Sequence, residues 1–338
     1  MTLKNVFKPI KLGSCTIPNR VVFTAHSTGF AYGSVSDQQL AYHEARAKGG
    51  VGLDILEILS VHPTSPQGRR GRSLIASAKN LAEGYQNLMA AVKPHGMRVF
   101  QELWHGGHHA IPEDGSWPLS ASDIPSATAG VVPQPMTRGQ VQEIVEAFAN
   151  AARLCEEGGL DGVELHGAHG FLIQQFMSPL TNKRTDEYGG GFKNRIRFKL
   201  EVLGAIRAAV SKDFVVGIRL SPEMTPGGLD SQENARIVKV LQAEGLLDYS
   251  SIELLSSPVR TIGETAVVVD DVGHFEAAGV AEYLIEKGVA VTLVTRHREF
   301  APLMVPALRA RPALERLGRG NFILMTRAHL SGDRNEQN

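Results

Sequence analysis

Residues 137–165 read TRGQVQEIVEAFANAARLCEEGGLDGVEL, and this stretch shows how the chain builds its fold. Its apolar side chains recur at the spacing of one helix face, at Val141, Ile144, Val145, Phe148 and Ala152. Thr137 and Gln140 have the spacing of a capping box, and Gly158-Gly159 predicts the end of the helix. The apolar run 162–165 then reads as a buried strand, so the stretch predicts one step of a parallel α/β sheet.

The same alternation of strands and helices runs along the whole chain. Short β-branched runs predict strands at Val21–Ala25, Leu53–Glu57, Arg98–Leu103, Gly162–Leu165, Phe214–Leu220, Tyr249–Leu254, Ala266–Asp270, Val291–Thr295 and Phe322–Thr326. Helical patterns fall between most of these strands, and this is the arrangement of βα units in an α/β fold.

The alternation fails once, between the predicted strands around Ile252 and Val268. Parallel neighbours need a connection of about a dozen residues or more, usually with a helix. The bridge Ser256–Glu264 is shorter and reads as a loop. We therefore expect two structural units, with six βα-type strands before this seam and three strands with two helices after it.

The composition excludes several classes of protein. The 338 residues carry 35 basic and 35 acidic side chains, and a net charge of zero argues against a general nucleic-acid binder. Two cysteines, Cys15 and Cys155, are too few for a disulfide framework, an iron–sulfur cluster or a four-thiolate zinc site. Neither a signal peptide nor a run of ~20 apolar residues is found, so we expect a soluble, cytoplasmic protein.

The first candidate for chemistry is a pair of histidines, His166 and His169, just past the strand 162–165. In a (β/α)8 barrel that end of the strands holds the active site. Two neutral imidazoles three residues apart can donate two converging hydrogen bonds to one substrate oxygen. Two structurally satisfied loop histidines are the alternative, and a metal pair lacks a carboxylate or thiolate at a convincing distance.

A second cluster follows the third strand and reads ELWHGGHH from Glu102 to His109. Three histidines in five residues suggest a metal, whereas Gly106-Gly107 indicates close approach of the backbone to a ligand. From Gly106 to Met136 the chain has almost no periodicity, as is typical of a lid or binding loop.

Arg219 lies within the apolar strand Phe214–Leu220, where a charge needs a partner. Glu57 and Glu102, near the ends of neighbouring strands, would give a purely structural ion pair. An anionic cofactor is the functional alternative.

Five motifs in this order resemble those of the old yellow enzyme superfamily of FMN-dependent oxidoreductases. They are Asn19-Arg20, Gly49–Leu53 before Glu57, Leu103–Gly107, His166–Gly170, and Arg184–Gly190 with Asn194-Arg195. The resemblance runs from about Asn5 to Leu254 and is greatest to the branch of 2,4-dienoyl-CoA reductase and trimethylamine dehydrogenase. Val267–Arg296 resembles part of the nucleotide-binding region that follows the barrel in that branch.

The resemblance implies a TIM-type barrel that holds FMN at its carboxyl-terminal mouth, with Thr24, Ala25 and Ser27 along the isoalloxazine ring. Arg219 would stabilise the anionic reduced ring. Glu102 stands where the family usually has glutamine, and an ionised carboxylate would weaken flavin binding unless it is protonated or paired with Arg219. Ser27 replaces the cysteine that bonds to flavin in the amine dehydrogenases, so a non-covalent flavin is expected.

The resemblance also implies that His166 and His169 are the catalytic pair, which binds the substrate carbonyl or a similar oxygen. Polarising this oxygen makes the β-carbon a better hydride acceptor. Phe171 stands where many ene-reductases have the tyrosine that donates the second proton, so solvent or another group must supply that proton.

The largest departure from the family is at the seam, because barrel strands seven and eight, whose loops grip the FMN phosphate, are not evident. We expect an incomplete TIM-type barrel over 1–256, a seam over 257–264 and a partial nucleotide-binding-like, Rossmann-like segment over 265–338. In an alternative arrangement, Ala266–Asp270 and Val291–Thr295 take the places of strands seven and eight, which leaves Phe322–Thr326 surplus.

Other parts of that branch are also missing from the sequence. The cysteine-rich iron–sulfur loop and the glycine-rich entry to an FAD domain are absent. Asp270–His274 stands where a dinucleotide fingerprint would read GxGxxG, and Arg296 where an acidic ribose ligand is expected, so the dinucleotide signal is weak.

The sequence thus predicts an FMN-dependent oxidoreductase that passes hydride from NAD(P)H through flavin to an enoyl or enone substrate, or oxidises an amine. The alternative is a degenerate, cofactor-free family remnant without turnover. The expected partner is a small-molecule substrate, with neither nucleic acid nor a membrane, and a homo-oligomer is left open. No metal ligands are assigned.

Overall fold

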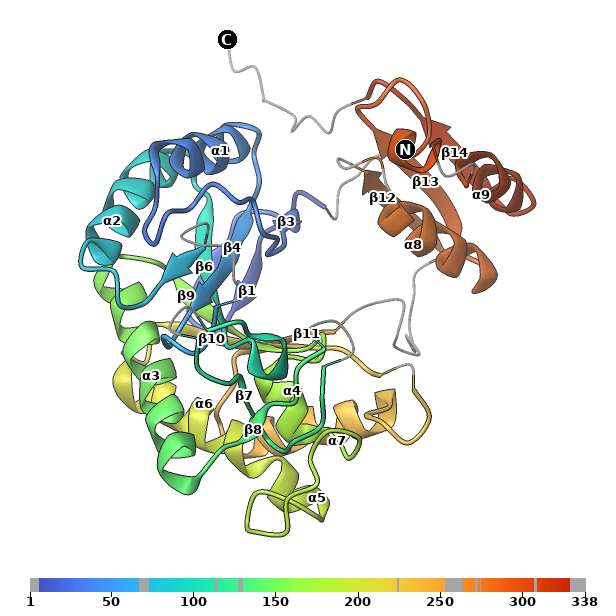
Figure 1. The fold of residues 1–338 in the computed structure, drawn as a ribbon. Helices are drawn as coiled ribbons and strands as arrows, with labels where there is room; N and C mark the ends of the chain where they lie inside the picture. Colours follow the sequence, from blue (N-terminus) through green and yellow to red (C-terminus); the bar gives the residue numbers. More distant parts are fainter. Residues whose placement is uncertain are drawn as a thin grey trace. The chain divides into compact units, whose positions relative to one another are not determined.

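The computed structural model describes residues 6–66, 73–112, 115–126, 130–223, 225–252, 264–270, 273, 275–306 and 309–328. The chain divides into two compact units, Met1–Ile252 and Glu253–Asn338 (Figure 1). The predicted seam at 257–264 lies outside the described residues except for Glu264. Its proposed boundaries stay a prediction.

The first unit is a curled parallel sheet with helices on its outer face (Figure 1). Its strands, in spatial order, are β11 (Tyr249–Ile252), β10 (Val215–Leu220), β9 (Gly162–Gly167), β6 (Arg98–Trp104), β4 (Leu53–Ser60) and β3 (Val22–Phe23), and β5 (Leu74–Ile75) also pairs with β4. The helices are α1 (Asp37–Lys48), α2 (Leu81–Val92), α3 (Arg138–Glu157), α4 (Leu172–Met177), α5 (Phe192–Arg195), α6 (Arg197–Ala209) and α7 (Ser231–Ala243). In the described part of this sheet, β3 and β11 each pair on one side only. The prediction of an α/β protein with an incomplete TIM-type barrel is confirmed.

Helix α3 forms as its sequence predicts. The Thr137 hydroxyl accepts from the Gln140 amide at 3.2 Å, and Gln140 Oε1 accepts from the Thr137 amide at 2.9 Å. The predicted apolar face is buried, including Val141, Ile144 and Phe148. Burying each such side chain contributes about 1.5–3 kcal/mol, so the face fixes the helix on the sheet.

A separate apolar cluster fills the interior of the curled sheet at the amino-terminal ends of the strands. A short hairpin of β1 (Ile10–Leu12) and β2 (Cys15–Ile17) contributes to it. The buried members of the cluster are Ile17, Leu53, Ile55, Phe100 and Val215. Polar groups further along the same strands therefore lie above an apolar floor.

The second unit is a three-stranded parallel sheet in the order β12 (Thr265–Asp270), β13 (Ala290–Thr295) and β14 (Phe322–Met325). Helices α8 (Phe275–Glu286) and α9 (Ala310–Leu317) accompany it, and their buried alanines pack in the same core as Val291 and Leu293 of β13. The arrangement in which β12 and β13 replace barrel strands seven and eight is wrong, because among the described residues β13 pairs with β14 and not with β3, and β12 does not pair with β11.

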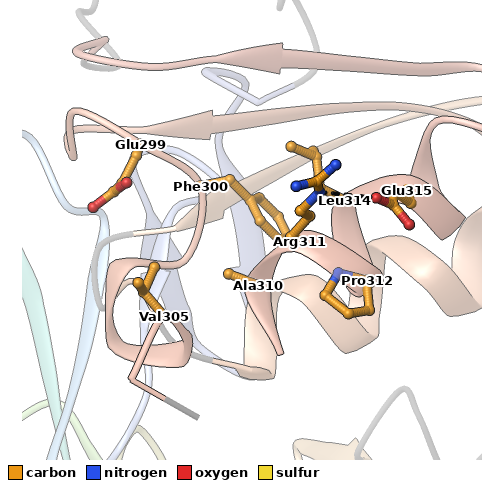
Figure 2. Close-up of a pocket in the computed structure, with 8 residues that line it drawn as sticks. All are labelled: Glu299, Phe300, Val305, Ala310, Arg311, Pro312, Leu314 and Glu315. Carbon is orange, nitrogen blue, oxygen red and sulfur yellow. Dashed lines mark hydrogen bonds and ion pairs between the residues drawn. The ribbon is translucent and has the colours of Figure 1, made fainter. Parts of the chain in front are cut away.

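The second unit also contains a pocket of about 470 Å³ between α9 and the segment that follows β13 (Figure 2). Phe300 and Leu314 are among its apolar lining residues, Arg311 and Glu315 lie near each other on α9, and Glu299 lies apart from them on the segment after β13. None of the residues expected to bind flavin or substrate lines it.

Every predicted strand is found in the described residues, most with ends that differ by a few residues, and Glu253 and Leu254 of the predicted Tyr249–Leu254 lie outside the described residues. The first is the shortest, since β3 keeps only Val22–Phe23 of the predicted Val21–Ala25. Within the described residues, no helix has both the length and the apolar character needed to cross a membrane.

One buried group conflicts with its surroundings. The side chain of Lys199 on α6 is fully buried, and its Nζ donates to the Met177 sulfur at 3.1 Å. Burial lowers the pKa of Lys199 well below its ordinary value, against the opposing pull of Glu233. Burial therefore disfavours the charged form of this amine in the folded protein, whereas the unfolded chain carries the charge in water.

We expect Lys199→Met to raise the free energy of unfolding at pH 7, because the thioether has no charged form that must be desolvated or neutralised on folding. The lowered pKa makes the parent gain stability as pH rises towards about 10.4, and the variant should lose that slope. Urea unfolding across pH measures both effects. Lys48→Met, at an exposed side chain, is the matched control. Equal stability of parent and Lys199→Met across pH would contradict the account.

Candidate active site

Strand register determines which side chains meet inside the first unit. Glu102 on β6 pairs with Glu164 on β9, and His166 on β9 pairs with Arg219 on β10. Arg219 pairs in turn with Ser251 on β11. Because alternate residues of a strand face the same side, Glu164 and His166 both point inward. Two carboxyls, an imidazole and a guanidinium are thus gathered inside the curled sheet, towards the carboxyl-terminal ends of its strands.

Gly217 has a structural reason to be glycine. A Cβ at this position would clash with the ring of Tyr249 on β11. The Tyr249 ring also lies 5.8 Å from that of Phe100, in the apolar floor. The glycine therefore lets an aromatic ring separate the floor from the polar layer above it.

Glu102 is the most perturbed member of the candidate site. The side chain is buried, and its Oε1 lies 3.5 Å from Arg219 and 3.7 Å from His166 Nε2 with no hydrogen bond. Burial raises the pKa of Glu102 to about 8, with Glu164 adding to the rise and Arg219 opposing it. At neutral pH the carboxyl is therefore protonated and can donate as well as accept, as a glutamine does.

Glu164, which the sequence reasoning missed, lies beside Glu102 and is also buried. Its Oε2 accepts from the Ser251 hydroxyl at 2.8 Å. Burial raises the pKa of Glu164, and Ser251, Tyr249 and Arg219 oppose the rise. A charged residue in the apolar strand DGVEL was the signal available in the sequence.

His166 and His169 contact each other at the mouth of this site. His166 is buried and its Nδ1 accepts from the Ala168 amide at 3.3 Å, so its proton is on Nε2, 3.2 Å from His169 Nδ1. His169 is exposed, has a φ of 57°, and its amide donates to Ser221 Oγ at 3.1 Å. The structure thus differs from the expected pair of converging donors, since one imidazole donates to the other.

The charge state of the pair follows from its surroundings. Burial lowers the pKa of His166 well below its ordinary range, and His169 and Arg219 lower it further. The ring of Phe171 packs edge-on against His166 at 4.8 Å and has no exchangeable proton. A neutral His166 donates one hydrogen bond, from Nε2, and carries no charge.

The structure distinguishes between the two partners expected for Arg219. Glu102 is beside it, whereas Glu57 accepts from the amide and hydroxyl of Thr28 at 2.7 and 2.8 Å and from Gln39 at 2.7 Å. Glu57 therefore anchors the segment after β3.

Thr24, Ala25 and Ser27 lie in the segment between β3 and that anchor. Thr24 and Ser27 are exposed, and Ala25 is half-buried against the apolar floor. These three expected flavin-contact positions lie next to a strand that also borders the interior of the sheet.

The second histidine cluster has a structural role. His109 accepts from Ser126 Oγ at 2.6 Å and lies 3.2 Å from His108, which donates to the Ile124 carbonyl at 3.1 Å. Burial lowers the pKa of His109 to about 4, and His108 adds to the shift. These contacts tie the long aperiodic loop to the strand that precedes it. Among the described residues, no three His, Cys, Asp or Glu side chains are grouped to hold a metal ion.

The interpretation of Gly106-Gly107 as a place for ligand approach stays a prediction, and the structure gives both glycines a packing reason as well. A Cβ on Gly107 would clash with the side chain of Gln175, and one on Gly106 would contact the Ser65 carbonyl at 2.8 Å. Protein groups therefore fill the space that a side chain would take at both positions.

The chain belongs to the NADH:flavin oxidoreductase / NADH oxidase family, which it matches over residues 5–271. The NADH oxidase of Thermoanaerobacter brockii is 38% identical over 248 residues, 72% of this chain and 38% of the relative. The N,N-dimethylglycine/sarcosine dehydrogenase of Chromohalobacter salexigens is 39% identical over 258 residues, 75% of this chain and 37% of the relative. The structure of Old Yellow Enzyme from Pichia sp. AKU4542 is similar, with a TM-score of 0.67, 26% identity and coverage of 95% of this chain and 82% of that one.

The resemblance to the old yellow enzyme superfamily is thereby confirmed. The family consists of oxidoreductases that use NAD(P)H and flavin. The chain nevertheless spans only 38% and 37% of the length of the two relatives. Its own reaction and cofactor are therefore matters for proposal.

We expect Glu102→Gln to change how stability depends on pH. The folded protein keeps a proton on Glu102 up to about pH 8, whereas the unfolded carboxyl loses it near its ordinary pKa of 4.5. The raised pKa makes the parent lose stability as pH rises through this window. The amide variant should lack that loss and exceed the parent above pH 8 on the order of 3–5 kcal/mol, at about 1.36 kcal/mol per pKa unit.

Denaturant unfolding at several pH values between 4 and 9 measures this difference. Glu143→Gln, at an exposed carboxylate, is the matched control and should follow the parent at every pH. Parallel curves for parent and Glu102→Gln would mean that Glu102 ionises normally in the folded protein.

Proposed function

We propose that this chain is an FMN-dependent NAD(P)H oxidoreductase that reduces a small enoyl or enone substrate. The reaction would take place at the carboxyl-terminal ends of the parallel strands in the first unit. The observation that carries the proposal is the buried cluster of Glu102, His166 and Arg219, whose three strands bring polar groups together above an apolar floor. Desolvated polar groups of this kind are costly for stability and are typical of a site of chemistry.

The residues present fit the ring portion of FMN. The buried Glu102 Oε1 lacks a hydrogen bond, and a protonated carboxyl there supplies a donor and an acceptor for the flavin edge. Arg219, with a side chain 21% exposed, supplies a cation. Thr24, Ala25 and Ser27 are proposed ring contacts. FMN, when bound, would supply the two-electron hydride chemistry, and Ser27 favours non-covalent binding.

Each side chain of the site has a distinct task in this proposal. Arg219 stabilises negative charge in a desolvated place, where an oriented cation is worth far more than in water. We assign His169 the contact with the substrate oxygen, where it stabilises negative charge that develops, and His166, which donates to His169 Nδ1, holds His169 in place. Because His166 is held neutral, it donates to His169 without adding a second cation beside Arg219.

The proposal extends to the rest of the chain. We assign residues 1–256 to the catalytic domain, residues 257–264 to the seam, and residues 265–338 to the nucleotide-binding-like segment. With two cysteines, the chain is proposed to act without an iron–sulfur cluster. We also propose that the partner is a small-molecule substrate and that the protein is cytoplasmic. The proposal includes no oligomeric state.

Two alternatives have observations in their favour. An amine substrate is favoured by the identity of 39% to a protein named as a dimethylglycine and sarcosine dehydrogenase. β3 and β11 are the outermost strands of the described sheet, at the places where the phosphate-binding strands of a barrel would follow. This observation favours a cofactor-free remnant without turnover.

The absorption spectrum of the purified protein, before and after addition of FMN, tests the proposal. Bands of a bound flavin that is released intact on denaturation would support it, and reduction by NAD(P)H followed by reoxidation with an enone identifies the substrate class. A folded protein that stays colourless with excess FMN would support the remnant. Reoxidation that needs no enone, together with flavin reduction by an amine, would support the amine dehydrogenase.

We expect the double substitution His166→Ala with His169→Ala to slow reoxidation by an enone at least about 10²–10³-fold, the effect of losing one oxyanion donor. Reduction of the flavin by NAD(P)H develops no substrate oxyanion and should change much less. Stopped-flow measurement of the two half-reactions separates these outcomes. Equal losses in both would show that the pair only maintains the structure.

A further inference from the structure

A groove of about 580 Å³ lies between α6 and α7 in the first unit and is also lined by the short helix α5. Arg195 on α5 pairs with Glu233 in the first turn of α7, and Arg207 Nε on α6 donates to the Leu246 carbonyl at 3.3 Å. These contacts hold the walls of the groove at a fixed spacing. None of the residues proposed to bind flavin or substrate lines it, so the candidate active site does not account for it.

The inner side of the groove is apolar. Phe192, Leu200, Val240 and Leu246 are half-buried and pack against the main core of the unit, and Ile196 is buried in that core. Because the half-buried side chains keep an exposed part, the groove offers apolar surface that a ligand can remove from water. Its volume also falls within the roughly 300–1,000 Å³ of pockets that bind small molecules.

Basic side chains stand beside this apolar surface. Lys193, Arg197 and Arg236 line the groove and are exposed. The guanidinium carbon of Arg236 lies 3.9 Å from the centroid of the Phe192 ring. This cation–π contact holds the charge of Arg236 against the apolar lining, and Lys193 follows Phe192 directly in the chain.

The acidic groups near the groove are engaged by other residues or lie at its other end. Glu201 Oε2 accepts from the Tyr188 hydroxyl at 2.9 Å, and Glu233 pairs with Arg195. Glu244, which also lines the groove, directly follows α7. It lies roughly 12 Å beyond Arg236 along the helix axis, at about 1.5 Å per residue.

The two ends of the groove therefore differ in charge. In the part of the chain that the structure describes, neither Lys193 nor Arg236 takes part in an ion pair, so the end beside Phe192 keeps its positive charge. The residues that line the groove include three basic and two acidic side chains, which gives a net charge of +1. One carboxylate balances this charge, whereas a phosphate monoester, at about −1.5 to −2, exceeds it.

We propose that the groove between α6 and α7 is a binding site for an amphipathic carboxylate, a small acid with an acyl chain or an aromatic ring. The carboxylate lies between Lys193 and Arg236, whose guanidinium presents two parallel N–H donors to such a group. The apolar body lies over Leu200 and Val240. Glu244 repels a carboxylate at the other end, so the ligand binds in one orientation. The inference does not rest on the proposed oxidoreductase activity.

Calorimetric titration of the purified protein with sodium octanoate tests the site. We expect one octanoate to bind per chain, and binding to weaken as salt concentration rises. Octan-1-ol and octylammonium have the same chain without the anionic head, and their affinity should be at least about tenfold lower. No binding of octanoate, equal binding of the three probes, or tighter binding of octyl phosphate would refute the proposal.

Substitutions of exposed side chains test the two ends of the groove. Lys193→Gln and Arg236→Gln should each weaken octanoate binding about 3–10-fold, because each removes a charged donor. Glu244→Gln should strengthen binding, because it removes a repulsion. Lys239→Gln, at an exposed side chain of α7 outside the groove, is the matched control and should bind as the parent does. Parent-like binding in both cation variants, or weaker binding in Glu244→Gln, would contradict the assignment.

Methyl NMR of the full chain locates the bound octanoate. Its addition should shift the signals of Leu200, Val240 and Leu246 and leave the imidazole signals of His166 and His169 unchanged. Shifts confined to the two histidines would place octanoate in the candidate active site and overturn the groove assignment. A protein that binds no FMN but shows the expected methyl shifts would refute the proposed function and support the groove site.

Discussion

The burial of Glu102 is the constraint on which the candidate site depends. Alternate residues of a strand face the same side of the sheet. The register of the parallel strands therefore places Glu102 and Glu164 in one inward-facing layer and His166 and Arg219 in the next. The apolar floor, with Phe100 and the Tyr249 ring over Gly217, closes this space from below. A carboxyl there cannot be well hydrated, so it keeps its proton, and the chemistry open to its neighbours follows from that state.

This changes how the replacement of the family glutamine by Glu102 is understood. An ionised carboxylate would have repelled an electron-rich flavin edge. Burial raises the pKa of Glu102 to about 8, and the neutral acid offers the same donor and acceptor pattern as an amide. Unlike an amide, it can also release a proton, with Arg219 close enough to stabilise the anion. The replacement therefore adds a chemical capacity while keeping the binding pattern.

Two histidine-rich motifs of similar composition serve different purposes. His108 and His109 bond to Ile124 and Ser126 and fix a long loop. His166 and His169 bond to each other, between a buried carboxyl and the surface. The difference comes from what surrounds each pair. An imidazole whose partners are backbone and hydroxyl groups of a loop fixes that loop.

The sequence by itself determined the local elements and the family. The capping box of Thr137 and Gln140, the apolar face of α3 and the strand after it depend on contacts within a few residues. Only the tertiary structure decided that Glu102, not Glu57, lies beside Arg219, and that β12 and β13 form their own sheet instead of closing the barrel. Partners of this kind depend on strand register and on burial by distant segments. Neither is encoded in the spacing of residues along one strand, so the protonated state of Glu102 was decided by the fold and not by its motif.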